Sequence, residues 1–162
     1  MNATLEIIRK YLATELELSD EEYISNLDLL ENELFAPDGK LTQPISVGDL
    51  LSVLDDKSEF DGPSFQIIHL AERFETDEYI SGLIESSDSF IPSCPKWASI
   101  VFMRVLNDDE SRAVLVSKLR GSPRSSRARI VQLMEAIENE SYEFLDRTIP
   151  VKFAAREKGD LN

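Results

Sequence analysis

The only histidine of the chain, His69, stands three residues before Glu72, a spacing that places both side chains on one face of a helix. Such a pair could act as a general base or supply half of a metal site. The neighbouring residues favour a plainer interpretation, because Gln66, His69 and Arg73 form the narrow polar stripe of an otherwise apolar segment. We therefore interpret His69 as a structural histidine that is solvated or hydrogen-bonded.

The only cysteine, Cys94, precedes Pro95 at an expected helix start, where the helix dipole can lower the pKa of a thiol. A single cysteine and a single histidine can form neither an internal disulfide nor a Cys/His zinc site. Glycine-rich phosphate loops are absent, and Asp108-Asp109-Glu110 lacks the alternating ligands of a calcium loop. We expect a protein without catalytic residues, metal or cofactor, kept in a reducing compartment.

The charge of the chain is strongly negative and unevenly distributed. Thirty-one acidic against seventeen basic residues give a net charge of −14, which repels nucleic acid and anionic membranes and attracts basic partners. Residues 1–62 carry −11, residues 63–92 carry −5, and residues 93–162 carry +2. No run is long and apolar enough for a membrane span and the start lacks a signal peptide, so we expect a cytoplasmic protein.

Aromatic residues interrupt the acidic runs of the first half of the chain. Carboxylates can draw in a basic protein partner, and aromatic side chains beside them can act as anchors that slow its dissociation. We predict that the partner-binding residues are Tyr23, Asp28, Glu31, Asp55, Asp56, Glu59, Phe60, Asp61, Glu75, Asp77, Glu78 and Tyr79.

The one basic cluster consists of Arg120, Arg124, Arg127 and Arg129. No aromatic residue is interleaved for base stacking, so the cluster does not indicate a nucleic-acid site. We interpret it as a solvated face or as ion-pair partners for the acidic half of the same molecule.

The first half of the chain has the pattern of short helices. An apolar stripe predicts a helix over 3–16, and Ser19-Asp20-Glu21-Glu22 is a capping box that opens a second one. Residues 35–45 hold the turn signal Pro37-Asp38-Gly39, and this loop is the best candidate for an internal joint. A weaker capping pattern at Ser46 predicts a short third helix.

Prolines then recur at expected helix starts, at positions 63, 95 and 123, and each start leads into two helices. The expected helices are 64–74 with 77–85, 96–106 with 109–120, and 124–138 with 141–147. The spacing is that of antiparallel helix pairs, arranged either as a short HEAT-like or armadillo-like solenoid or as an irregular bundle. We expect an all-α chain that is a single domain over 1–162, with acidic N-terminal helices over 1–62, a helix-pair array over 63–150 and a polar tail over 151–162.

An acidic, all-helical chain with these acidic runs and with helix pairs from Pro63, Pro95 and Pro123 resembles the immunity proteins of bacterial polymorphic-toxin and contact-dependent growth inhibition systems. The resemblance implies binding to a cognate toxin domain, often a basic nuclease, with its active site or substrate access blocked. The alternative from a different class is a helical-repeat scaffold or adaptor that binds a basic partner or peptide.

Overall fold

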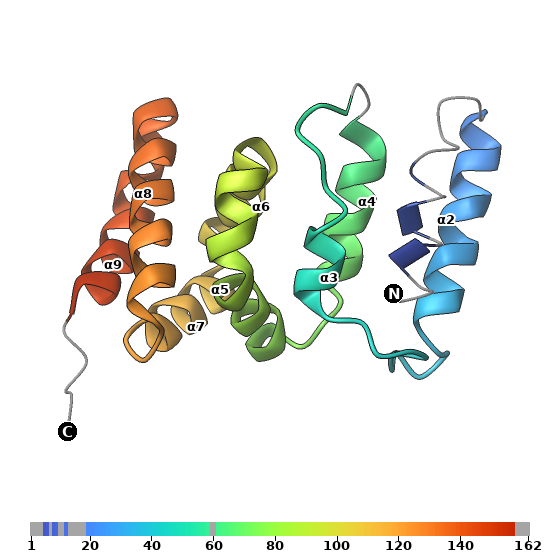
Figure 1. Ribbon diagram of the computed structural model, residues 1–162, viewed down its shortest axis with the longest axis horizontal. Coiled ribbons are helices and arrows are strands. Elements are labelled where there is room, and N and C mark those ends of the chain that lie inside the picture. Colours follow the sequence, from blue (N-terminus) through green and yellow to red (C-terminus); the bar gives the residue numbers. More distant parts are fainter. Residues whose placement is uncertain (1–4, 7, 10–11, 13–18, 59–60, 158–162) are drawn as a thin grey trace. The chain divides into compact units, whose positions relative to one another are not determined.

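A computed structural model describes the chain except for residues 1–4, 7, 10–11, 13–18, 59–60 and 158–162 (Figure 1). It consists of two compact units, residues 1–73 and residues 74–162. The described residues are mainly helical, and their extended pairing is limited to one isolated bridge between Phe35 and Leu41. The prediction of an all-α chain is confirmed. That both units belong to one domain stays a prediction.

Helices α2 and α3 of the first unit begin at reciprocal caps. Helix α2, Asp20–Leu34, starts after Ser19, whose Oγ accepts the N–H of Glu22 at 3.3 Å while the Ser19 N–H donates to the Glu22 carboxylate at 2.9 Å. Helix α3, Val47–Leu51, repeats the arrangement with Ser46 and Asp49 at 3.0 and 2.9 Å. Each box satisfies two backbone N–H groups locally, so both helix starts follow from the sequence.

Helix α4, Asp61–Ala71, packs against α3 (Figure 1). It begins before the expected start at residue 64, so Pro63 lies in its first turn, where a missing N–H costs nothing. The side chains that fill the core of this unit are Leu30, Leu34, Ile45, Leu50, Leu51, Ile67, Ile68 and Ala71. Of the helix expected over 3–16, residues 5, 6, 8, 9 and 12 are described and are helical, and the others lie outside the described residues.

The turn around Gly39 lies inside the first unit and does not separate the units. Gly39 has φ +81°, a conformation that glycine adopts without strain, and its N–H donates to the Ala36 carbonyl at 2.8 Å. The expectation that residues 35–45 form the internal joint was wrong, because the boundary between the units follows Arg73. A turn signal marks where a chain reverses, which need not be where its packing divides.

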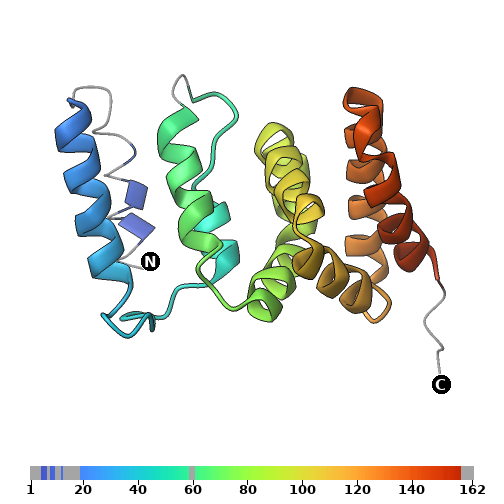
Figure 2. The ribbon, with the colours of Figure 1, turned by 180° about the vertical axis from the view of Figure 1, so that it is seen from behind.

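The second unit is a group of helices in which α6 contacts each of the other α-helices. Its elements are α5, Thr76–Ser93; α6, Pro95–Asn107; α7, Asp109–Leu119; α8, Arg124–Glu140; the 3-10 turn η2, Tyr142–Phe144; and α9, Leu145–Arg156. Helix α5 packs on α7 and α8, and α9 packs on α7 and α8 (Figures 1 and 2). Trp97, Val101 and Phe102 of α6 are fully buried, as the nearly unbroken apolar run of this helix predicts.

Two of the three expected helix pairs lie within the second unit. Pro95 is the first residue of α6 and Pro123 directly precedes α8, so both prolines stand at helix starts as predicted. Each of these helices packs against the helix that follows it, α7 or α9. The members of the remaining pair, α4 and α5, belong to different units. A solenoid-like repeat therefore stays a prediction.

Residues 151–156 are helical and do not belong to a polar tail, contrary to expectation, and residues 158–162 of the expected tail lie outside the described residues. Helix α9 continues through Pro150 to Arg156, and Val151, Ala154 and Ala155 are buried against the rest of the second unit. Proline lacks the N–H that would bond back along the helix, yet the burial of this apolar stripe outweighs that loss. Among the described residues, no helix is both long enough and apolar enough to cross a bilayer.

Candidate partner-binding surface

One side of α2 presents carboxylates around a solvent-exposed leucine. Leu29 is 63% exposed, and Glu22 and Glu33 lie near it, two turns before it and one turn after it. Asp28 and Glu21 are exposed on the adjoining side of the helix. Within the part of the chain that the structure describes, these four carboxylates have no basic side chain in ion-pair contact. We call Glu21, Glu22, Asp28, Leu29 and Glu33 the α2 face.

The charge on the α2 face is not neutralised by its own helix. The last turn of α2 contains no basic residue, although Glu31 and Glu33 stand there, at the end of a helix where negative charge is unfavourable. Glu31 is compensated by Arg73, which forms an ion pair with it and stacks over the Phe35 ring, 4.4 Å from its centroid. Glu31, one of the predicted binding residues, is therefore already engaged, whereas Glu33 has no ion-pair partner among the residues that the structure describes.

A second group of predicted residues lies between α3 and α4. Asp55 is exposed and its carboxylate accepts the N–H of Lys57 at 2.9 Å, so it also fixes a turn. Asp56 is half-buried, and Asp61 is exposed in the first turn of α4, where a carboxylate suits the helix dipole. Glu59 and Phe60 lie outside the described residues, as does the side chain of Tyr23 on α2.

The remaining predicted residues belong to the second unit. Glu75 and Glu78 are exposed at the start of α5, and Asp77 forms an ion pair with Lys118 of α7 at 2.9 Å. Tyr79 is only 5% exposed, so it is part of the core and cannot serve as the exposed aromatic anchor that we expected. The twelve residues are thus divided between the two units.

Leu29 was not among the residues predicted from the sequence. Its signal is a leucine two residues after Leu27 and one before Leu30, which places it off the apolar stripe of α2. An apolar residue off the stripe of an amphipathic helix is exposed unless another element covers it. The exposure of Leu29 shows that no described residue covers it.

Two of the four arginines in the basic cluster have partners within the second unit. Arg127 donates through Nη1 to the carbonyls of Ala155 and Glu157, at 3.1 and 2.8 Å, and so caps the end of α9. Arg120 forms an ion pair with Glu157 at 2.7 Å. The expected pairing with the acidic half of the chain is therefore wrong for these two residues. Arg124 and Arg129 are exposed.

A structural role explains the positions of the residues that were considered for catalysis or metal binding. His69 is exposed on α4 beside a half-buried Glu72, and Cys94 is buried where α5 ends and α6 begins. Asp108 caps α7 by accepting the Ser111 N–H at 2.8 Å, and hydrogen bonds from Ser111 hold the pKa of this carboxyl below its usual value. Across the described residues, His, Cys, Asp and Glu side chains do not gather in threes that could hold a metal ion.

The first unit combines a small helical core with a strongly charged outer surface. Residues 1–73 hold sixteen acidic and five basic residues, a net charge of −11, whereas residues 74–162 carry −3. On α2, exposed carboxylates without an ion-pair partner among the described residues surround the exposed Leu29, which makes the α2 face a candidate protein-binding surface.

The comparison with known families identifies the kind of binding. The family model of Immunity protein 30 matches residues 13–115, and the chain belongs to this family. It is an immunity protein of a toxin-immunity system, and this family implies a toxin as its protein partner. The match covers most of the first unit and extends into α7. No curated protein and no solved structure matches the chain.

Proposed function

We propose that this immunity protein neutralises a basic toxin domain, a nuclease, by placing the α2 face in the cationic groove that otherwise receives phosphates. The observation that carries the proposal is the exposure of Leu29, 63%, among carboxylates without a described ion-pair partner. The carboxylates replace the phosphate charges of the nucleic acid, and Leu29 supplies an apolar anchor that excludes water. Occupation of the groove blocks access of the substrate.

The position of Glu33 supports a role in binding rather than in folding. A carboxylate in the last turn of a helix opposes the helix dipole, typically by a few tenths of a kcal/mol at an exposed site. Glu33 is exposed, and no base in the last turn of α2 offsets it. A residue that conflicts with its own helix is expected at functional positions, where a partner compensates it.

The net charge of −11 on residues 1–73 has a kinetic consequence for this encounter. Opposite potentials on two proteins raise the association rate by roughly 10 to 1000 times at low ionic strength, and salt removes the effect. We expect the association rate with the toxin to fall steeply as salt increases. The dissociation rate, which depends on desolvated contacts such as that of Leu29, changes less.

The carboxylates predicted between α3 and α4, together with Glu75 and Glu78, extend this proposal as further attractive charges. Asp77 and Glu31 are engaged by Lys118 and Arg73, so we give them secondary weight. We also propose that the protein acts in the cytoplasm, where a nuclease toxin meets its substrate, as part of a contact-dependent growth inhibition system.

The test uses the toxin domain encoded next to the immunity gene. The full chain is compared with the double variant Asp28→Lys/Glu33→Lys and with the control Glu85→Lys/Glu140→Lys, which makes the same change of charge at exposed carboxylates of the second unit. Association rates are measured by stopped flow at low and high salt, and protection is measured by survival of cells that express the toxin.

We expect the α2 variant to associate at least about tenfold more slowly at low salt, because it removes local attraction, and to protect cells less. The control loses the same net charge but keeps the α2 face, so its rate falls by a smaller factor. Equal losses in the two variants would show that only net charge matters and would refute this placement of the interface. A toxin with an acidic surface would refute the proposed partner class.

A further inference from the structure

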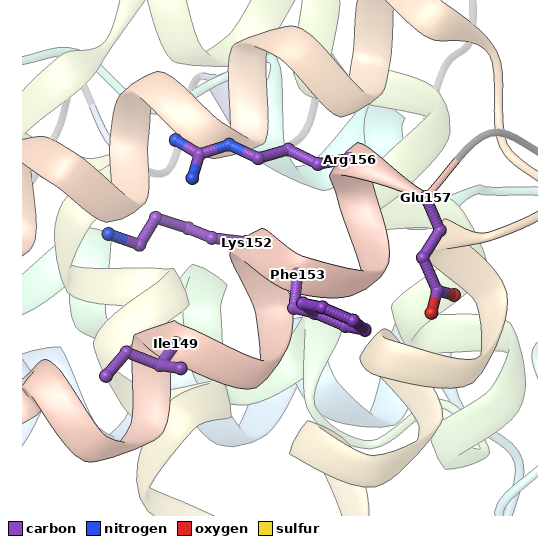
Figure 3. A pocket seen from close by; sticks show the side chains of 5 residues that line it. All are labelled: Ile149, Lys152, Phe153, Arg156 and Glu157. Carbon is purple, nitrogen blue, oxygen red and sulfur yellow. The ribbon is translucent and has the colours of Figure 1, made fainter.

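Helix α9 exposes a second apolar surface outside the part of the chain that matches the family. Ile149 and Phe153 stand one turn apart and are 50% and 66% exposed. They line a surface hollow of about 330 Å³ together with Lys152, Arg156 and Glu157. Figure 3 shows that Lys152 and Arg156 extend in one direction from the helix, while Phe153 and Glu157 point away from them.

Asp146 and Arg156 stand at opposite ends of one helical stripe with Ile149 and Phe153 between them, and the Arg156 side chain leans towards Glu135 of α8. Asp146, one turn before Ile149, is exposed and has no ion pair with any residue that the structure describes. Arg156, one turn after Phe153, has a side chain that is 60% exposed and a 3.0 Å contact with Glu135, itself 49% exposed. An exposed pair of this kind contributes little, so Arg156 can also serve a second carboxylate. We call Asp146, Ile149, Phe153 and Arg156 the α9 stripe.

The α9 stripe has an acid at one end, a base at the other and apolar residues between them. Two copies of the stripe are therefore complementary when they run antiparallel. When two copies of α9 lie antiparallel, centred on Val151, Ile149 of each copy faces Phe153 of the other. In the same register Asp146 of each copy faces Arg156 of the other. A two-fold contact uses one patch on both subunits, and this order of residues satisfies that requirement.

We propose that two copies of this chain associate through antiparallel contact of their α9 stripes. The apolar pairs form the centre, and the two Asp146–Arg156 pairs form a charged rim at either end, which is the usual anatomy of a protein interface. Tyr142, 78% exposed just before α9, adds apolar area beside the contact. One helix from each side gives less than the roughly 1,600 Å² of a standard interface, so the dimer is weak and depends on concentration.

The proposal is independent of how the toxin is bound. The α2 face belongs to the first unit, and the α9 stripe belongs to the second. Self-association through the α9 stripe is therefore measured without the toxin. A separate measurement of protection in cells tests whether the toxin covers this stripe.

The test is sedimentation equilibrium of the full chain from about 10 µM to about 1 mM, a range that spans weak association. We expect the mass of the wild type to rise from that of a monomer towards that of a dimer. Phe153→Glu should weaken association at least about tenfold, because it places a charge in the apolar centre. Helical circular dichroism verifies that each variant is folded.

Charge exchange tests the register. Asp146→Arg alone sets two arginines opposite each other, and Arg156→Asp alone sets two carboxylates opposite each other, so each single variant should associate more weakly than the wild type. The double variant Asp146→Arg/Arg156→Asp restores opposite charges across the contact and should recover association. A double variant as weak as the single variants would overturn the proposal.

Two further results would also overturn it. One is a wild type that remains monomeric at every concentration, and the other is a dimer that Phe153→Glu leaves unchanged. Folded Phe153→Glu should protect cells from the toxin as well as the wild type does. Loss of protection by this variant, with a monomeric wild type, would show that the toxin and not a second copy covers the α9 stripe.

Discussion

Replacement of Lys152 by methionine should destabilise the second unit in a pH-dependent way. Lys152 of α9 and Glu138 of α8 form an ion pair at 2.7 Å whose side chains are only 16% and 15% exposed. The Glu138 carboxylate also accepts a hydrogen bond from the hydroxyl of the fully buried Thr148. Lys152→Met keeps the length and the apolar stem of the side chain but leaves this carboxylate without its cation.

The size of the effect follows from the partial burial of the pair. Removal of one partner of a fully buried ion pair costs about 3–5 kcal/mol, and an exposed pair contributes at most about 1 kcal/mol. Because this pair retains some contact with water, we expect a loss of about 2 kcal/mol at neutral pH. For a chain of this length such a loss corresponds to a decrease of roughly 4–8 °C in Tm.

The pH dependence has a definite sign. Burial raises the pKa of Glu138, but hydrogen bonds from Lys152 and Thr148, together with the charges of Lys152 and Arg156, outweigh it and hold the pKa below its ordinary value. In the wild type, the stability from Glu138 is present above its unfolded pKa and is lost as pH falls through the lower folded pKa. In Lys152→Met the cost of burying the charged Glu138 carboxylate is no longer offset by Lys152. Protonation of Glu138 as pH falls removes this cost.

Urea unfolding followed by circular dichroism checks this prediction at neutral pH and near pH 4. The difference between wild type and Lys152→Met should be largest at neutral pH and should shrink in acid. The control is Lys40→Met, which removes an exposed partner of Asp38 and should cost less than about 0.5 kcal/mol. The reasoning is refuted if Lys152→Met is as stable as the wild type at neutral pH, or if its deficit is the same at both pH values.

Two other predictions concern the two units. Arg127→Met should lower the free energy of unfolding by about 1–2 kcal/mol, because it removes the donor to the Ala155 and Glu157 carbonyls at the end of α9. The control is Arg129→Met, at an exposed position. Equal effects of the two substitutions in urea unfolding would contradict the capping role of Arg127. The whole chain should unfold as one domain, with equal calorimetric and van't Hoff enthalpies, and two separate transitions in scanning calorimetry would show that residues 1–73 and 74–162 are independent domains.

The helix starts could be predicted from the sequence because their causes are local. Ser19 and Ser46 each meet an acidic residue three positions later, and Pro95 and Pro123 stand where a missing N–H has no cost. Pro150 misled the prediction for the opposite reason. Whether a proline ends a helix depends on what the following residues bury, and the core around Val151 is formed by residues distant in the sequence.

The candidate site was predicted less well because exposure and pairing are tertiary properties. The sequence shows that Glu31 is acidic, but its partner Arg73 stands 42 residues away. Tyr79 directly follows Glu78 and could be taken for an anchor beside charge, yet adjacent helical residues point in different directions and Tyr79 is buried. Leu29 is the opposite case. Its position off the apolar stripe of α2 could be read from the sequence, but only the structure shows that it is exposed.

Residues 1–73 carry a net charge of −11, so like charges repel one another in this part of the unbound protein. Mutual repulsion among like charges favours expansion, and counterions from salt or from a cationic protein relieve it. A basic partner would therefore do more than occupy the surface, since binding to the folded form alone also stabilises that form. The free immunity protein would therefore unfold and be cleaved by proteases more readily than the same protein bound to its toxin.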